Sequence, residues 1–293
     1  MSATLTAPET DSVKARILQG IDEFTMIPAT AMEAMQVGRN PACSLKEYGR
    51  IIERDHRLMA EILGMANSWL NSTGAPVTTV VDAVNRLGLN KCQELILATC
   101  TAGLMKKLPF RDTRIRQQLW RHGYLTAVVC MQLNQKMRLG FKGEEFTAGL
   151  MHDLGRCLIA ATEPELFVQA VTEIGTDSSR TLQVERAILG TDHCEIGREF
   201  AMRNELPEQL VAAIEHHHAP LEATEHSTIA TTVAMAAEIS ARLDRDQPPI
   251  DPDGEGVPPS PLYEDMARLR DIVSDMTRDF TEKVYSEANK LVS

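Results

Sequence analysis

A histidine and an aspartate stand next to each other in an apolar stretch of this 293-residue chain. The stretch is Ala148-Gly-Leu-Met-His152-Asp153-Leu-Gly155-Arg156, and we expect it to be a helix that ends at Gly155. Burying such a pair is costly unless a partner compensates it, and the simplest partner is a metal ion. Adjacent residues on a helix point about 100° apart. His152 and Asp153 can therefore flank an ion but not enclose it, so other helices must supply more ligands.

Further histidines fall on successive predicted helices of the second half. The candidate metal ligands are His122, His152, Asp153, His193, His216 and His217. Helix bundles build metal sites from side chains that face inward on neighbouring helices. Imidazole suits zinc, iron, manganese or nickel, and Asp153 makes the set a mixed nitrogen and oxygen one. One or two such ions could activate water and clamp a phosphate, and Arg156, one turn after His152, could reach an anionic ligand.

The same histidines also have a simpler interpretation. A single histidine on a helix is more often a hydrogen-bonded core or surface residue than a metal ligand. The run His216-His217-His218 before Pro220 could be an exposed helix end that the helix dipole favours. Histidines on several successive helices favour a shared site, but they do not establish catalysis.

The elements that must position these residues are predicted to be helices. Aromatic residues make up only 4% of the chain, whereas Ala, Leu, Met, Glu and Arg are abundant. Apolar spacing predicts five or six short helices up to Leu108 and then a long helix from Thr113 to Met137. The segment from Glu144 to Thr162 holds the pair. The fold class is therefore predicted to be all-α, a multi-helix array.

Composition divides the chain into five segments. We expect a flexible leader at 1–12, an N-terminal helical lobe at 13–108, a second helical lobe at 109–243, an acidic proline-rich linker at 244–261 and a C-terminal helix at 262–293. Prolines prevent the linker from continuing a helix. The last segment has apolar residues at helical spacing, so it either folds back on the core or forms a homodimer.

The charge and the cysteines restrict the class of protein. A net charge of −11 argues against a general nucleic-acid binder or a binder of anionic membranes. No apolar run reaches the roughly 18 residues of a membrane span, and residues 1–11 lack the layout of a signal peptide. The six cysteines are scattered without a C-x-x-C pair, which is typical of core residues in a reducing compartment. We therefore expect a cytoplasmic protein.

The order of these motifs resembles the HDOD family, a branch of the HD phosphohydrolase superfamily. The motifs that carry the resemblance are His122, the 148–156 stretch, Asp192-His193-Cys-Glu-Ile196-Gly197, His216-His217-His218-Ala-Pro220, Ile27-Pro28-Ala29, Met65-Ala66-Asn67-Ser68 and Val81-Asp82-Ala83-Val84-Asn85-Arg86-Leu87-Gly88. The resemblance covers roughly Ile17 to Leu243. It implies an HD-like helical bundle with an N-terminal helical lobe.

The resemblance also implies roles for the candidate ligands. His122, His152 and Asp153 match the superfamily metal set, while His193, His216 and His217 match extra ligands of the two-metal HD-GYP relatives. The set should end in an aspartate, but Ala237 takes its place.

Two other elements depart from the relatives' pattern. The Gly-Tyr-Pro element that marks cyclic-di-GMP hydrolases is missing after His218, and Arg156 stands where a lysine is frequent. The sequence therefore matches the motifs of the superfamily's hydrolases only in part.

Two functions remain open at this point. The first is a non-enzymatic signalling or regulatory module, acting through protein partners or through a bound nucleotide or metal, and the missing carboxylate at Ala237 favours it. The alternative is a metal-dependent phosphohydrolase or phosphodiesterase in which His152, Asp153 and Arg156 carry the catalysis. The intact histidine series favours this alternative.

Overall fold

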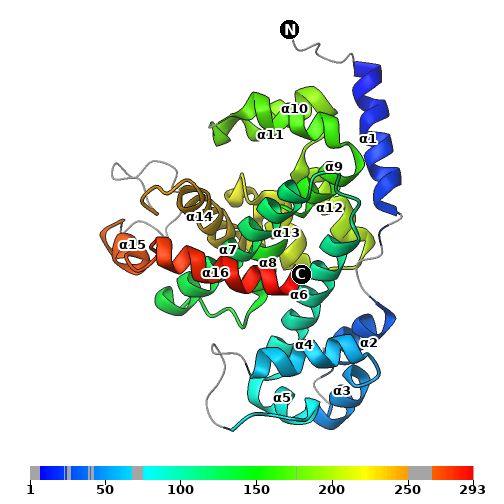
Figure 1. Ribbon diagram of the computed structural model, residues 1–293, viewed down its shortest axis with the longest axis vertical. Coiled ribbons are helices and arrows are strands. Elements are labelled where there is room, and N and C mark those ends of the chain that lie inside the picture. The colour runs from blue at the N-terminus through cyan, green and yellow to red at the C-terminus, as the bar shows by residue number, and fades with distance from the viewer. Residues whose placement is uncertain are drawn as a thin grey trace.

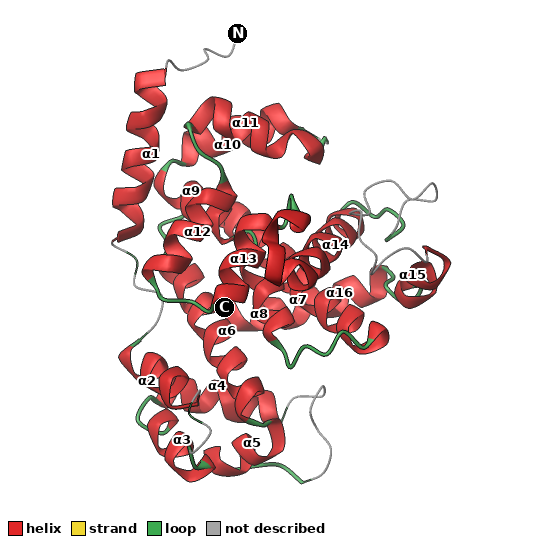
Figure 2. Ribbon diagram, turned by 180° about the vertical axis from the view of Figure 1, so that it is seen from behind, coloured by secondary structure: helices red, strands yellow, loops and turns green. Residues whose placement is uncertain are grey.

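The structure is a computed structural model that describes residues 7–22, 24, 28–38, 40, 43–67, 75–175, 177–249 and 266–292. Within these ranges every regular element is a helix, as Figures 1 and 2 show, which confirms the predicted all-α class. Among the described residues, no helix combines the length and the apolar character needed to cross a bilayer.

The first lobe is a group of short helices below the main body in Figure 1. It contains α2 (Ala29–Gly38), α3 (Leu45–Ile52), α4 (His56–Ala66) and α5 (Val80–Leu87), and α6 (Leu89–Lys107) runs from it into the main body. Side-chain caps fix two of the helix starts, because the hydroxyls of Ser44 and Thr79 accept backbone N–H bonds from Glu47 and Asp82.

The first helix does not belong to that lobe. Helix α1 (Ala7–Asp22) lies beside the second half of the chain instead (Figure 1). Lys14 Nζ is 2.6 Å from Glu195 Oε1, and Arg16 Nε is 2.6 Å from Glu163 Oε1. Because α1 begins at Ala7, part of the expected leader at 1–12 is helical, and residues 1–6 lie outside the described part.

The second half surrounds one long central helix. Its elements are α7 (Thr113–Met137), α8 (Glu144–Met151), α9 (Leu154–Thr162), α10 (Pro164–Ile174), α11 (Thr181–Leu189), α12 (His193–Arg203), α13 (Glu208–His216) and α14 (Ser227–Asp244). Helix α7 has the predicted bounds and packs against α8 and α14. Its buried residues, among them Leu125, Val129 and Leu133, make it the core of the bundle.

The histidine and aspartate pair lies at a break between two helices. The helix expected to run through the pair is interrupted there, because α8 ends at Met151 and α9 begins at Leu154. Asp153 leaves helical geometry, with φ −94° and ψ 16°. Gly155, expected to end the helix, is instead the second residue of α9.

Glycines explain why this broken segment packs so closely on its neighbours. A Cβ atom on Gly155 would lie 1.9 Å from the carbonyl oxygen of His193, and Gly197 of α12 faces it at the same crossing. A Cβ atom on Gly149 would lie 2.8 Å from Cα of Ala127 in α7. Side chains at these positions would separate the backbones, so glycine is what allows α9 to touch α12 and α8 to touch α7.

The C-terminal segment folds back on the main body. It forms α15 (Met266–Val273) and α16 (Arg278–Val292), so the single helix expected over 262–293 is interrupted. Helix α16 lies along α7, where Trp120 Nε1 donates a hydrogen bond of 2.8 Å to the carbonyl oxygen of Ala288 (Figure 1). Most of the expected linker, residues 250–261, lies outside the described residues.

Replacing Gly155 tests the close crossing of α9 and α12. We expect Gly155→Ala to lower the free energy of unfolding by about 3 kcal/mol, because the new methyl group meets backbone atoms that cannot rotate away. Urea unfolding followed by circular dichroism measures the change. The control is Gly64→Ala in α4, where a Cβ atom meets nothing within 4 Å and stability should be equal or higher. Equal effects of the two changes would contradict this account of the crossing.

Candidate metal centre

The structure brings potential metal ligands together in two adjoining groups. The first contains His122, His152 and Asp153, and the second contains His193, Cys194, His217 and His218. Within each group, one ligand atom from every residue lies within 4.8 Å of the others. The groups combine side chains from α7, from the break between α8 and α9, from the start of α12 and from the end of α13.

The carboxylate of Asp153 connects the two groups. Its Oδ1 lies 3.7 Å from His152 Nε2, 3.5 Å from His193 Nε2 and 3.7 Å from His217 Nε2. The helix breaks at Asp153, and the carboxylate and its neighbour His152 face the same centre. The other two imidazoles come from other helices, so the pair flanks this centre and does not enclose it.

Two imidazoles are oriented by backbone carbonyl groups. His152 Nδ1 lies 2.8 Å from the carbonyl oxygen of Gly149, and His217 Nδ1 lies 3.0 Å from that of Ile214. A carbonyl oxygen only accepts, so each Nδ1 carries the proton and donates. In the neutral rings Nε2 then presents its lone pair to the centre, as a metal ligand must.

Two further imidazoles are oriented by carboxylates. His193 Nδ1 lies 2.6 Å from Glu185 Oε2, which also accepts a 2.9 Å bond from the backbone N–H of His193. His122 Nδ1 lies 2.9 Å from Asp244 Oδ2. Carboxylates bound to the outer nitrogen of a histidine fix its tautomer and raise its basicity as a metal ligand.

Neither of these two carboxylates was among the ligands predicted from the sequence. Glu185 lies on the helix before His193, and nothing in its spacing marks it. Asp244 follows Ala237 by seven residues, which is about two helical turns and keeps both on one side of α14. This spacing could have indicated that α14 presents the carboxylate of Asp244 to His122.

The protonation states also suit a divalent ion. Burial lowers the pKa of His152 to about 4 and lowers that of His217 well below its usual value. Burial would raise the pKa of Asp153, but His152, Arg156 and His193 outweigh it and hold that pKa well below the usual value. His152 and His217 are therefore neutral and Asp153 is ionised, the forms in which these groups bind metals.

His193 and His217 make the closest contact within the centre. Their Nε2 atoms lie 3.2 Å apart. Burial opposes a charge on His193, but Cys194 and Glu185 outweigh it and raise its pKa well above the usual value. A proton on His193 can therefore bridge the two nitrogens, and a divalent ion fits the same place. Together with the nitrogen, oxygen and sulfur donors, this geometry fits a transition-metal ion.

Not every predicted ligand reaches the centre. His216 belongs to neither group, and its Nε2 lies 3.6 Å from Glu215 Oε2. It is the last residue of α13, whereas His217 and His218 follow the helix end and join the second group. Arg156 lies at the edge, with Nη1 at 3.5 Å from Asp153 Oδ2.

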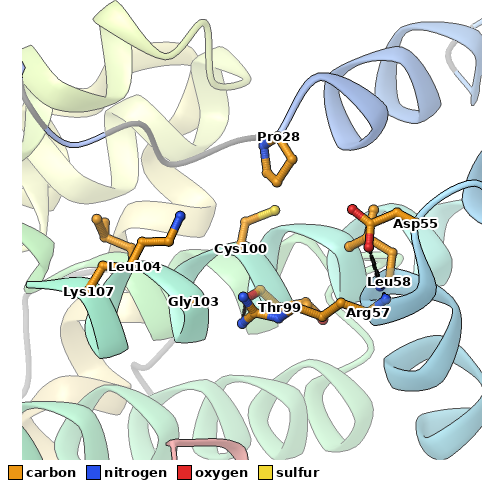
Figure 3. Close-up of a pocket in the computed structure, with 9 residues that line it drawn as sticks. All are labelled: Pro28, Asp55, Arg57, Leu58, Thr99, Cys100, Gly103, Leu104 and Lys107. Atoms are coloured by element: carbon orange, nitrogen blue, oxygen red, sulfur yellow. Dashed lines mark hydrogen bonds between the residues drawn. The ribbon is translucent and has the colours of Figure 1, made fainter.

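A separate pocket lies between the first lobe and α6 (Figure 3). It is lined by Pro28, Asp55, Arg57, Leu58, Thr99, Cys100, Gly103, Leu104 and Lys107, and it shares no residue with the histidine groups. Arg57 lies along α6, where its Nη2 donates a 3.4 Å bond to the carbonyl oxygen of Thr99. Gly103 makes room for the guanidinium, since a Cβ atom there would lie 2.7 Å from Nη2. No sequence motif predicted this pocket.

The helical bundle with its histidine and aspartate centre defines an HD-type protein. The family model for the HDOD domain matches residues 24–220. The chain therefore belongs to the HDOD domain family, as its motifs had indicated.

Known relatives share the fold over nearly the whole chain. An HDOD domain protein of unknown function from Geobacter sulfurreducens superposes with a TM-score of 0.75, at 25% identity, covering 98% of this chain and 99% of that one. A protein from Shewanella amazonensis SB2B, described as a candidate phosphohydrolase, gives a TM-score of 0.68 at 25% identity, covering 95% and 98%.

A curated relative is longer than this chain. An uncharacterized protein of Treponema pallidum (strain Nichols) is 27% identical over 243 residues, which are 82% of this chain and 46% of the relative. The chain thus spans about half the length of that relative.

Glu185 tests how the centre is held. We expect Glu185→Ala to lower the free energy of unfolding by about 3 kcal/mol, because it leaves the buried ring and backbone N–H of His193 without their acceptor. Zinc affinity, measured by competition with a chromophoric chelator, should fall by about 10- to 100-fold. The control is Glu199→Ala on α12, which removes a surface pair with Arg198 and should change stability by less than about 1 kcal/mol. Unchanged zinc affinity in Glu185→Ala would show that Glu185 does not support a metal ligand.

Proposed function

We propose that this chain is a regulatory HDOD protein that acts through protein partners and holds a divalent metal centre without using it for catalysis. The observation that carries the proposal is the orientation of four imidazoles. In His122, His152, His193 and His217, an oxygen atom binds Nδ1, which leaves Nε2 for an ion. A core histidine also satisfies its Nδ1, but here the Nε2 atoms of His152, His193 and His217 all lie within 3.7 Å of one oxygen of Asp153.

His122, His152 and Asp153 would hold one ion, and the second ligand group would hold another. An ion bound in such a group polarises its ligands and lowers the pKa of bound water. The chain itself orients the imidazoles and limits the entry of water, because His152, His193 and His217 are at most 5% exposed. A centre of this kind would connect α7, the α8–α9 break, α12 and α13, and so stabilise the surface that these helices present to a partner.

The same burial supports a non-catalytic use. A phosphate ester would have to reach ligand atoms that the bundle largely covers. Ala237 adds no carboxylate, and Asp244 of the same helix binds the outer nitrogen of His122. These features favour an ion that maintains a conformation over one that turns over a substrate.

Metal content and metal-dependent stability test this proposal. We expect purified protein to hold one or two equivalents of zinc, iron, manganese or nickel by elemental analysis, and a chelator to lower its melting temperature, because an ion that binds the folded state stabilises it. His193→Ala should abolish the metal-dependent shift. The control, His56→Ala, removes an exposed histidine of α4 and should keep it. Absence of bound metal and of any shift with all four ions would refute the metal centre.

A phosphohydrolase is the second candidate. Arg156 lies beside Asp153 at the partly exposed edge of the centre, where a guanidinium could bind a phosphate. The likeness to a Shewanella amazonensis protein described as a candidate phosphohydrolase adds to this alternative.

Hydrolysis assays separate the two candidates. Metal-loaded protein should not hydrolyse bis-p-nitrophenyl phosphate or cyclic dinucleotides with added manganese, iron or zinc, because substrates cannot readily reach the buried ligands. Turnover that needs a metal and disappears in His152→Ala, while the helical signal in circular dichroism stays intact, would establish the phosphohydrolase instead. Loss of turnover in His152→Ala excludes a contaminant, and a parallel His56→Ala sample, which should keep the turnover, controls for the replacement of a histidine as such.

A further inference from the structure

Cys194 lies among the imidazoles of the second ligand group. Its Sγ is 3.6 Å from His193 Nε2 and 3.9 Å from His217 Nδ1, and the thiol is buried. In the described part of the chain, no other cysteine belongs to either ligand group. The sulfur therefore has a position that the other cysteines do not share.

The distances match those of a tetrahedral site. Zinc binds thiolate sulfur at about 2.3 Å and imidazole nitrogen at about 2.0–2.1 Å. Tetrahedral angles then place two nitrogen ligands about 3.3 Å apart and a sulfur about 3.6 Å from a nitrogen. The observed separations are 3.2 Å between His193 Nε2 and His217 Nε2 and 3.6 Å between Cys194 Sγ and His193 Nε2. With His218, these residues provide four ligands.

The backbone around Cys194 favours a negatively charged ligand. Cys194 is the second residue of α12, whose start is capped by Asp192 through a bond from the backbone N–H of Glu195. The first turn of a helix stabilises anionic groups, including thiolates. A thiolate bound to an ion is therefore well placed here.

We propose that Cys194 is a sulfur ligand, so that the centre has two chemically different ion positions. The position at His122, His152 and Asp153 offers nitrogen and oxygen atoms. The position at Cys194 adds a thiolate, which selects Zn²⁺, Co²⁺ or Fe²⁺ over Mg²⁺ and Mn²⁺ because soft sulfur prefers softer ions. This inference rests on the proposed metal centre and gives its second position a specific chemistry.

Cobalt spectroscopy tests the ligand directly. Metal-free full-length protein is titrated with Co²⁺, and bound cobalt is counted by equilibrium dialysis while the absorption spectrum is recorded. We expect a thiolate-to-cobalt charge-transfer band in the near ultraviolet. Cys194→Ser should lose the band and bind Zn²⁺ at least about tenfold more weakly. The control, Cys157→Ser, changes a buried cysteine of α9 that lies outside both groups and should keep the band.

The outcomes distinguish this inference from the proposed function. Cobalt binding without the charge-transfer band overturns the sulfur ligand but leaves the metal centre standing, whereas absence of cobalt binding overturns both. If Cys194→Ser fails to fold, the X-ray absorption spectrum of zinc-loaded wild-type protein decides. A sulfur scatterer at about 2.3 Å from zinc supports Cys194 as a ligand, and a shell of nitrogen and oxygen alone overturns it.

Discussion

The buried carboxylate of Asp153 is the constraint on which the second half of this protein depends. A negative charge that is 6% exposed must be balanced within the bundle, and three imidazoles approach one of its oxygens from α8, α12 and α13. Each of these helices must hold its position for the balance to persist. The core therefore combines apolar packing with one polar centre that fixes how the helices are arranged.

Small residues make that arrangement sterically possible. Gly149 and Gly155 stand on either side of the pair and let the segment approach α7 and α12 at backbone distance. Gly197 completes the second crossing from the opposite helix. The same short segment thus contains two candidate ligands, His152 and Asp153, and the two glycines that allow its close helix contacts.

Much of the fold could be predicted from the sequence, because apolar periodicity and caps are local signals. The bounds of α7 follow from them, as does the all-α class. The break at Asp153 was not predicted, because the helix through the pair was expected to end at Gly155, which instead allows a backbone contact with α12. Local patterns do not report such contacts.

The site was predictable to a similar extent. The resemblance identified His122, His152 and Asp153, which the structure brings together. From the triple histidine it named His216 and His217, whereas His217 and His218 join the second ligand group. Which of the three histidines joins the group depends on where α13 ends. His216 is the last residue of the helix, and His217 and His218 follow it. Glu185 acts through space and only the three-dimensional arrangement reveals it, whereas the spacing of Asp244 from Ala237 was a usable signal in the sequence.

One turn of α7 has a consequence for the far end of the chain. Trp120 holds α16 through the carbonyl oxygen of Ala288, and His122, two residues later, holds Asp244 at the end of α14. The end of α14 and the helix α16 are thus both fastened to the same helical turn. A small shift of this turn would move both fastening points together.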